Sequence, residues 1–206
     1  MRSLCFIAGV SCVIRCFMKT SDDSKFVIDP VTGLLQGVSY VASPNYDERP
    51  ANCAVDVIII HAISLPPGCF GGVEIEQLFC NSLDATQHPY FTEICDLEVS
   101  AHFLIRRDGE IVQFVPVTQR AWHAGESSCL GRTQVNDFSI GIELEGCDEK
   151  SFDQSQYNAL VDLTRCLFKT FPNLSTDCLF GHSDIAPGRK TDPGPCFDWA
   201  VYRAAL

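Results

Sequence analysis

Two histidines and one aspartate are the side chains of this sequence best suited to hold a metal ion together. His61 follows a run of apolar residues at 55–60, and His182 follows a shorter apolar stretch at 178–180. A histidine at the end of a buried strand can project into a cleft at the edge of a sheet. Two imidazoles and the carboxylate of Asp192 would make a three-ligand zinc site whose fourth position stays free for water, as in catalytic zinc centres.

The segment GHSDIAPGRKTDPGP, residues 181–195, carries two of these side chains among residues that favour loops. It holds three glycines and three prolines, so we expect a stiff loop that brings His182 and Asp192 to one metal ion at a reduced entropy cost. Asp184 is a rival ligand, although an aspartate in this place also favours a turn. On spacing alone, Lys190 is a solvated surface lysine, and each histidine has a purely structural alternative.

The strands expected to position these residues can be read from apolar runs and alternation. VDVIII at 55–60 is typical of a buried central strand. Residues 99–106 and 110–115 alternate around Asp108-Gly109, which is a strong hairpin signal. FSIGIEL at 138–144 predicts a further strand.

Two helices are predicted, a short one at 73–80 and a long one at 154–171. In the long one, apolar residues recur with the 3.6-residue period of a single helix face. Asp153 is placed to cap its start, with Gln156 three residues on, and Pro172 ends it. We therefore predict a mixed α/β fold in which one domain has a central mixed β-sheet flanked by α-helices.

Composition excludes several classes of function. The 206 residues (22.7 kDa) are enough for one domain with a sizeable core. The formal net charge is −11 and no basic run occurs, so phosphate-rich partners would be repelled and no nucleic-acid function is expected. The twelve cysteines form no CxxC pair, and we expect mostly reduced thiols that pack as small hydrophobic groups.

The first twenty residues are expected to be an extension outside the fold. Their apolar run, residues 4–14, has the length of a signal peptide and is too short to span a bilayer. Arg15 follows at once, and no small-residue cleavage site stands after the run. A misassigned start that should be Met18, a weak signal and a short interfacial anchor are the three alternatives, and no stable membrane span is expected.

Four longer segments together resemble the AmpD-type N-acetylmuramoyl-L-alanine amidases. They are HAISLPPGCFGG (61–72), VSAHFLIRRDGEIVQFVPVTQRAWHAG (99–125), NDFSIGIELEG (136–146) and GHSDIAPGRKTDPGP (181–195). The family consists of zinc enzymes related to phage lysozyme-like amidases and to peptidoglycan recognition proteins. Several long motifs in the same order are far more specific than one, and the similarity runs from about Gly37, so the resemblance implies an amidase domain at 37–206.

The resemblance also implies roles for individual residues. His61, His182 and Asp192 match the zinc ligands of the family, Glu143 matches its proton acceptor, and Lys190 matches the residue that stabilises the transition state. The implied substrate is a small muropeptide bearing 1,6-anhydro-N-acetylmuramic acid, cut at the amide between the lactyl group and L-alanine. A monomer acting in cytoplasmic recycling of peptidoglycan fragments is expected. Strand alternation alone would instead put Glu143 on a solvent-exposed face, opposite the neighbouring apolar side chains.

Departures from the family pattern concern the expected substrate contacts. Ala62 follows the first ligand where asparagine is common, and Glu98 and Gln134 stand where arginines are expected. Arginines there would suit substrate carboxylates, so their absence affects peptide recognition more than catalysis. Arg132 is the remaining candidate for a carboxylate clamp.

Three further side chains near these motifs have expected roles. Trp122 and His123 are expected to line the sugar site. His102 is expected to be structural or to support a ligand, because Ala101 replaces the tyrosine that precedes the matching histidine in the phage-type branch. Two rival functions remain, a non-catalytic peptidoglycan-binding module and an envelope amidase acting on intact wall.

Overall fold

A mixed six-stranded β-sheet, in the order β1-β5-β4-β9-β3-β10, forms the centre of the molecule. The structure is a computed structural model that describes residues 25–206, so the expectations for residues 1–20 lie outside the described part. Along the sheet the strands are β1 (Ser39–Tyr40), β5 (Ile111–Gln113), β4 (Phe103–Ile105), β9 (Ser139–Glu145), β3 (Val57–Ile63) and β10 (Leu179–Gly181). Only the β4 and β5 pair is antiparallel, and the other neighbours run parallel.

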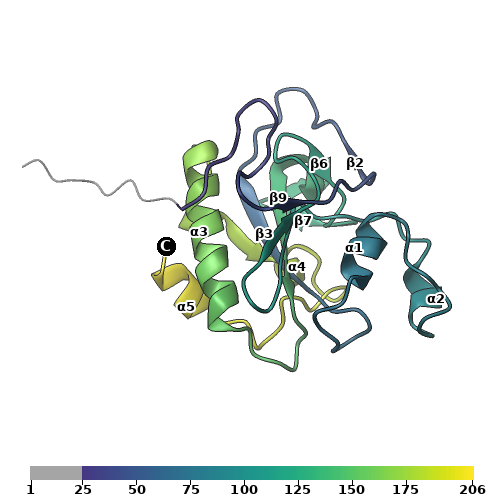
Figure 1. Cartoon of the computed structure of the whole chain (residues 1–206). Coiled ribbons are helices and arrows are strands. Elements are labelled where there is room, and N and C mark those ends of the chain that lie inside the picture. The colour runs from purple at the N-terminus through teal and green to yellow at the C-terminus, as the bar shows by residue number, and fades with distance from the viewer. Residues whose placement is uncertain (1–24) are drawn as a thin grey trace, which may run out of the picture.

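Helices cover both faces of this sheet, as predicted (Figure 1). They are α1 (Glu74–Phe79), α2 (Phe91–Ile94), α3 (Gln154–Thr170), α4 (His182–Ile185) and α5 (Trp199–Ala204), with 3-10 turns η1 (Val135–Phe138) and η2 (Thr176–Cys178). Two small ribbons complete the fold, β2 (Tyr46–Asp47) with β6 (Arg120–Ala121) and β7 (Ser128–Cys129) with β8 (Arg132–Thr133).

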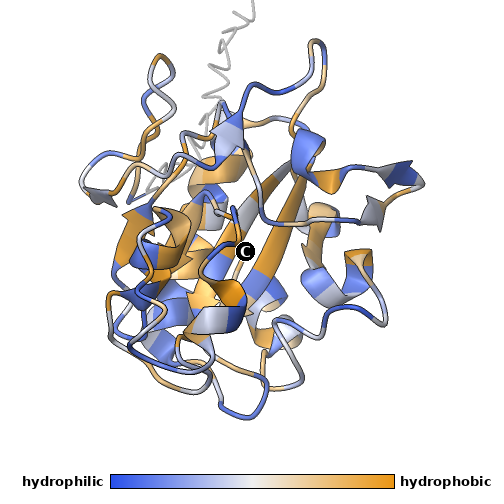
Figure 2. Ribbon diagram, turned by 90° about the vertical axis from the view of Figure 1, so that its right-hand side faces the viewer, coloured by the Kyte–Doolittle hydropathy of each residue, from blue (hydrophilic) through white to orange (hydrophobic). Residues whose placement is uncertain are grey.

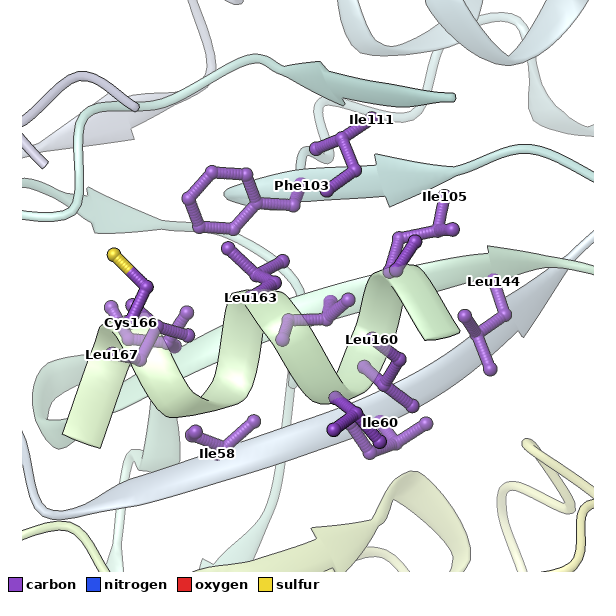
Figure 3. Close-up of a cluster of buried hydrophobic side chains, with 14 of the residues drawn as sticks. Ile58, Ile60, Phe103, Ile105, Ile111, Leu144, Leu160, Leu163, Cys166 and Leu167 are labelled. Carbon is purple, nitrogen blue, oxygen red and sulfur yellow. The ribbon is translucent and has the colours of Figure 1, made fainter. Parts of the chain in front are cut away.

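The long helix α3 covers one face of the sheet over the largest apolar cluster. Its inner side chains Leu160, Leu163 and Leu167 are fully buried against Ile58 and Ile60 of β3 and other strand residues (Figure 3). Burying a leucine side chain contributes roughly 1.5 to 3 kcal/mol, so this face alone accounts for much of the stability of the sheet. Helix α5 adds to the same cluster through its own buried face.

The opposite face is shared by two smaller apolar clusters, and the candidate ligands lie on this side. Helices α1 and α2 pack over the β4 and β5 end of the sheet. Val57 and Ile59 of β3 pack with Phe138 and Ile185 at the other end. Figure 2 shows largely hydrophobic strands in the middle of the molecule, surrounded by helices that contain both hydrophobic and hydrophilic residues. Among residues 25–206, no helix is both long and apolar enough to cross a membrane.

Most of the predicted elements are confirmed within a few residues. Helix α3 starts after Asp153, which forms the predicted reciprocal capping pair with Gln156. Strand β3 continues to Ile63, so His61 lies inside the strand and the prediction that the strand ends before it was wrong. The predicted loop at 181–195 starts with the single turn α4. The cysteines of the described residues are all free thiols.

Candidate metal centre

Strand register brings two histidines and a glutamate into one row across the sheet. In the parallel pair of β3 and β9, His61 lies opposite Glu143. In the parallel pair of β10 and β3, Gly181 lies opposite Ile60. His182, the next residue after Gly181, therefore lies beside His61. Side chains alternate between the two faces of a strand. His61 therefore points to the face opposite α3, while its neighbour Ile60 packs under that helix.

The loop after α4 returns to place Asp192 against both histidines. The Ser183 N–H donates to the Asp192 carbonyl at 2.9 Å and closes the loop. One carboxylate oxygen of Asp192 then lies 3.1 Å from Nδ1 of His61 and 3.2 Å from Nδ1 of His182, and the two Nδ1 atoms are 3.0 Å apart. In a tetrahedral zinc site with bonds of 2.0 to 2.1 Å, neighbouring ligand atoms are about 3.3 Å apart. The triangle therefore has nearly the size that zinc requires.

The protonation states of these groups also suit a metal ion. His182 Nε2 lies 3.2 Å from the Ala124 carbonyl, and a carbonyl only accepts, so this nitrogen carries the proton and Nδ1 presents a lone pair. Burial lowers the pKa of His61 to about 4. Although burial opposes it, the adjacent imidazoles of His182 and His61 hold the pKa of Asp192 well below its usual range. Neutral imidazoles and an ionised carboxylate are the forms that bind metal.

Glu143 lies beside this triangle with one oxygen unengaged. Its side chain is only 9% exposed, and Oε2 is buried without a hydrogen-bond partner among the described residues. Burial, reinforced by the negative charge of Asp192, raises the pKa of the carboxyl well above its usual value, and Lys190 opposes this shift. The prediction from alternation that Glu143 lies on a solvent-exposed face was wrong: the alternation is right, but α1, α2 and the loops cover this face.

A pocket of about 410 Å³ opens over the triangle and Glu143. Lys190 lies on its wall together with Asp192 and His182. One side is apolar and comes from the region of α1 and α2, including Leu78, Phe79, Tyr90, Ile94 and Leu97. The opposite rim is formed by the residues that follow β9, among them Cys147, Asp148 and Glu149. The pocket thus combines a polar floor with an apolar wall, which is typical of a site for a small ligand.

Of the three residues predicted to contact the substrate, two line the pocket and one does not. Trp122 and His123 both line the pocket, and the Trp122 indole Nε1 is buried without a hydrogen-bond partner in the part of the chain that the structure describes. Arg132 is elsewhere: its guanidinium donates to Asp56 at 2.7 Å and stacks over the Phe138 ring at 3.7 Å. The structure therefore gives no geometric support to Arg132 as a clamp for a ligand in this pocket, and that role stays a prediction.

Of the three positions that depart from the family pattern, one lines the pocket and two do not. Ala62 lines the pocket beside the first ligand. Glu98 and Gln134 are exposed and do not line the pocket. The substitutions at these two positions therefore leave the inner pocket unchanged.

Two carboxylates and one histidine near the site are structural. Asp184 accepts the Gly181 N–H at 2.7 Å and lies outside the ligand triangle, as its turn-forming alternative predicted. Glu145 is buried and accepts the Gly71 and Arg107 N–H groups. His102 is fully buried, accepts the Gly141 N–H at Nδ1 and therefore donates from Nε2 to the Gln119 carbonyl.

Sequence reasoning missed the residues that hold the histidines from behind. Asn136 Oδ1 accepts the backbone N–H groups of His123 and Ala124. Ser139 Oγ lies 3.0 Å from His123 Nε2, and Arg189 donates to the Ala124 carbonyl at 2.8 Å. Asn136 and Ser139 lie far from all three ligands in sequence, and Arg189 is near Asp192 but contacts the distant Ala124, so only the fold reveals these contacts.

Comparison with known proteins identifies relatives that are amidases. Residues 51–195 match the model of the family described as N-acetylmuramoyl-L-alanine amidase. The 1,6-anhydro-N-acetylmuramyl-L-alanine amidase AmpD of Escherichia coli strain K12 is 54% identical over 174 residues, which cover 84% of this chain and 94% of that protein.

Solved structures agree with the fold. The crystal structure of a selenomethionine AmpD derivative matches with a TM-score of 0.84 and 51% identity, covering 87% of this chain and 99% of that one. A complex of the amidase AmiD from Escherichia coli with anhydro-N-acetylmuramic acid-L-Ala-D-γ-Glu-L-Lys matches with a TM-score of 0.55 and 29% identity, covering 76% and 60%. With a family model matching more than half of its length and close relatives covered almost completely, this chain belongs to the N-acetylmuramoyl-L-alanine amidase family.

Proposed function

We propose that this protein is a zinc-dependent amidase that cuts the bond between the lactyl group of 1,6-anhydro-N-acetylmuramic acid and L-alanine in muropeptides. The observation that carries the proposal is the triangle of His61, His182 and Asp192, two of whose members, His182 and Asp192, line a pocket together with Glu143. Two nitrogens and one carboxylate oxygen are a donor set used by hydrolytic zinc. The 54% identity to an enzyme named for this reaction supports the substrate class.

Glu143 is proposed to move the proton during hydrolysis. Zinc held by the triangle would lower the pKa of a coordinated water to about 7 and polarise the amide carbonyl. The unengaged oxygen of Glu143 accepts a proton from the attacking water and returns it to the amide nitrogen as the carbon–nitrogen bond breaks. The raised pKa of this carboxyl favours both steps, because a group that titrates nearer to neutral pH can accept and then donate a proton.

Lys190 is proposed to stabilise the charge that develops on the amide oxygen. Its side chain lines the same pocket as Glu143 and Asp192. A fixed positive charge next to a partly desolvated oxyanion stabilises it more than the same charge does in bulk water. The ammonium also favours the ionised form of Glu143, because it lowers the pKa that burial raises.

The pocket supports a small fragment as the substrate. Its volume of about 410 Å³ is at the low end of the range for small-molecule sites. An apolar wall and the free Trp122 N–H offer a surface and a donor for the sugar. Together with the similarity to an enzyme named for anhydro-muropeptides, this supports our proposal that the reaction belongs to the cytoplasmic recycling of soluble peptidoglycan fragments rather than to the intact wall.

Metal analysis combined with a cleavage assay tests this proposal. We expect about one zinc per chain and release of the stem peptide from an anhydro-muropeptide, measured by mass spectrometry and abolished by a chelator. Metal-free protein that binds the muropeptide without cutting it would indicate a recognition module. Cleavage of intact peptidoglycan at the rate of the soluble fragment would indicate an envelope amidase.

A further inference from the structure

The two candidate histidine ligands are held from behind by two consecutive residues. His61 Nε2 lies 2.9 Å from Nδ1 of His123, and His182 Nε2 lies 3.2 Å from the carbonyl oxygen of Ala124. We call His123 and Ala124 the ligand bracket. One short stretch of chain therefore contacts both imidazoles on the side away from the metal triangle.

Metal binding at the two Nδ1 atoms would determine the direction of each contact. When His61 and His182 present lone pairs at Nδ1, both carry their proton on Nε2 and donate it outward. His61 then donates to Nδ1 of His123, which places the His123 proton on Nε2, where it is donated to Ser139 Oγ at 3.0 Å. In these tautomers each ring nitrogen that faces the bracket has a partner of the correct kind, so the arrangement is compatible with metal binding at both Nδ1 atoms.

The bracket is itself held rigidly. The side-chain oxygen of Asn136 accepts the His123 N–H at 3.2 Å and the Ala124 N–H at 2.8 Å, so one amide fixes both residues. Arg189 donates to the Ala124 carbonyl beside His182. The His123 ring lies directly on strand β9 at Gly141, where a Cβ atom would come within 2.4 Å of the ring. The site therefore needs a residue without a side chain at position 141.

We propose that the ligand bracket orients both zinc ligands, with His123 as a positioning residue for His61 and Asn136 as the residue that fixes the bracket. The inference rests on the zinc site proposed above. It gives His123 a different main role from the sugar contact expected from sequence. Partners that orient a histidine ligand and fix its tautomer typically strengthen metal binding 10- to 100-fold.

Two variants of similar shape isolate the acceptor at His123. In His123→Asn the amide oxygen takes the place of Nδ1 and can still accept from His61, whereas His123→Leu fills the same space without an acceptor. We expect His123→Leu to weaken zinc affinity about 10- to 100-fold and His123→Asn to recover most of the loss. Asn136→Ala is expected to weaken zinc affinity in the same direction, and it carries the test if His123→Leu does not fold.

Zinc dissociation constants would be measured by competition with a fluorescent chelator, and folding by the Tm of the metal-free proteins. Tyr202→Phe is the control. It removes the buried hydrogen bond between Tyr202 and Thr164 of α3, which lies on the face of the sheet opposite the metal triangle. It should lower Tm and leave zinc affinity unchanged.

Equal zinc affinity in wild type and His123→Leu would overturn the proposed role of the ligand bracket. A rise in KM alone would also overturn it, because that result would indicate that His123 contacts the sugar. Wild-type protein that fails to bind zinc would overturn the proposed function itself.

Discussion

Glu143→Gln should have opposite effects on turnover and on stability. The substitution keeps the shape of the side chain and removes its ability to accept a proton. Proton transfer by a positioned group typically contributes 10²- to 10⁴-fold to the rate, so kcat should fall by about that factor. Zinc content should not change, because Glu143 lies outside the ligand triangle.

The stability effect follows from the raised pKa. An acid whose pKa is higher in the folded state binds more protons when folded, so folding loses stability as pH rises above the unfolded value near 4.5. The loss grows by about 1.4 kcal/mol per pH unit until the folded pKa is passed. Glutamine does not titrate. The zinc-free variant should therefore be more stable than zinc-free wild type at pH 7, and the difference should disappear below about pH 4.5.

Urea unfolding of the zinc-free proteins between pH 4 and pH 8, together with the cleavage assay, measures both effects. Glu145→Gln is the matched control, two residues further along the same strand. Glu145 is also buried, but it accepts two backbone N–H groups and lies 3.5 Å from the guanidinium of Arg106. Weakening these charge-assisted bonds should destabilise the protein by about 1 to 3 kcal/mol. If Glu143→Gln is no more stable than wild type at pH 7, the assigned burial cost is refuted, and unchanged turnover would refute the proton-transfer role.

Three further outcomes are expected. Asp192→Ala should lose zinc, measured by metal analysis, but keep a wild-type circular dichroism spectrum, because Asp192 lies in a loop outside the apolar clusters; global unfolding would instead show that the loop is structural. Lys190→Ala should keep zinc and lower kcat about 10²- to 10³-fold, and an unchanged rate would remove the lysine from the mechanism. Burial, reinforced by the positive charge of Arg49, lowers the pKa of His102 to about 3, so the unfolded state binds the extra proton between about pH 3 and 6.5 and stability rises with pH in this window. In His102→Asn, the slope of unfolding free energy against pH between 4.5 and 6 should be smaller by about 1.4 kcal/mol per unit, and an unchanged slope would show that His102 does not titrate in this way.

The sequence was sufficient to predict the elements whose patterns are local. The period of α3 and its capping pair lie within one stretch of chain, as does the hairpin of β4 and β5 around Asp108-Gly109. The end of β3 was misjudged because His61 and Ala62 interrupt the apolar run, while the backbone ladder with β9 continues to Ile63. Pairing with a neighbouring strand, rather than side-chain polarity, determines where a buried strand ends.

The site could be predicted only where a motif identified it. The resemblance marked His61, His182, Asp192 and Glu143, and the structure brings these four residues together. It could not mark Asn136, whose contacts to the bracket depend on how η1 lies against the segment that follows β6. Contacts of this kind depend on tertiary structure and have no periodicity or spacing in the sequence.

The arrangement of the ligands implies that the metal site is formed by the fold rather than the fold by the metal. His61 lies on β3, and His182 directly follows β10, the neighbouring parallel strand; backbone hydrogen bonds and the apolar residues on either side fix the register of the two strands. Small zinc domains that lack such a core depend on the metal for folding, and part of the binding energy is used to order the chain. Here the sheet positions both histidines and backbone hydrogen bonds close the loop that carries Asp192, so little of the binding energy is needed to order the chain. The ligand bracket adds to this preorganisation because the Ala124 carbonyl favours the metal-binding tautomer of His182, and His123 can accept from His61 when its Nδ1 binds the ion.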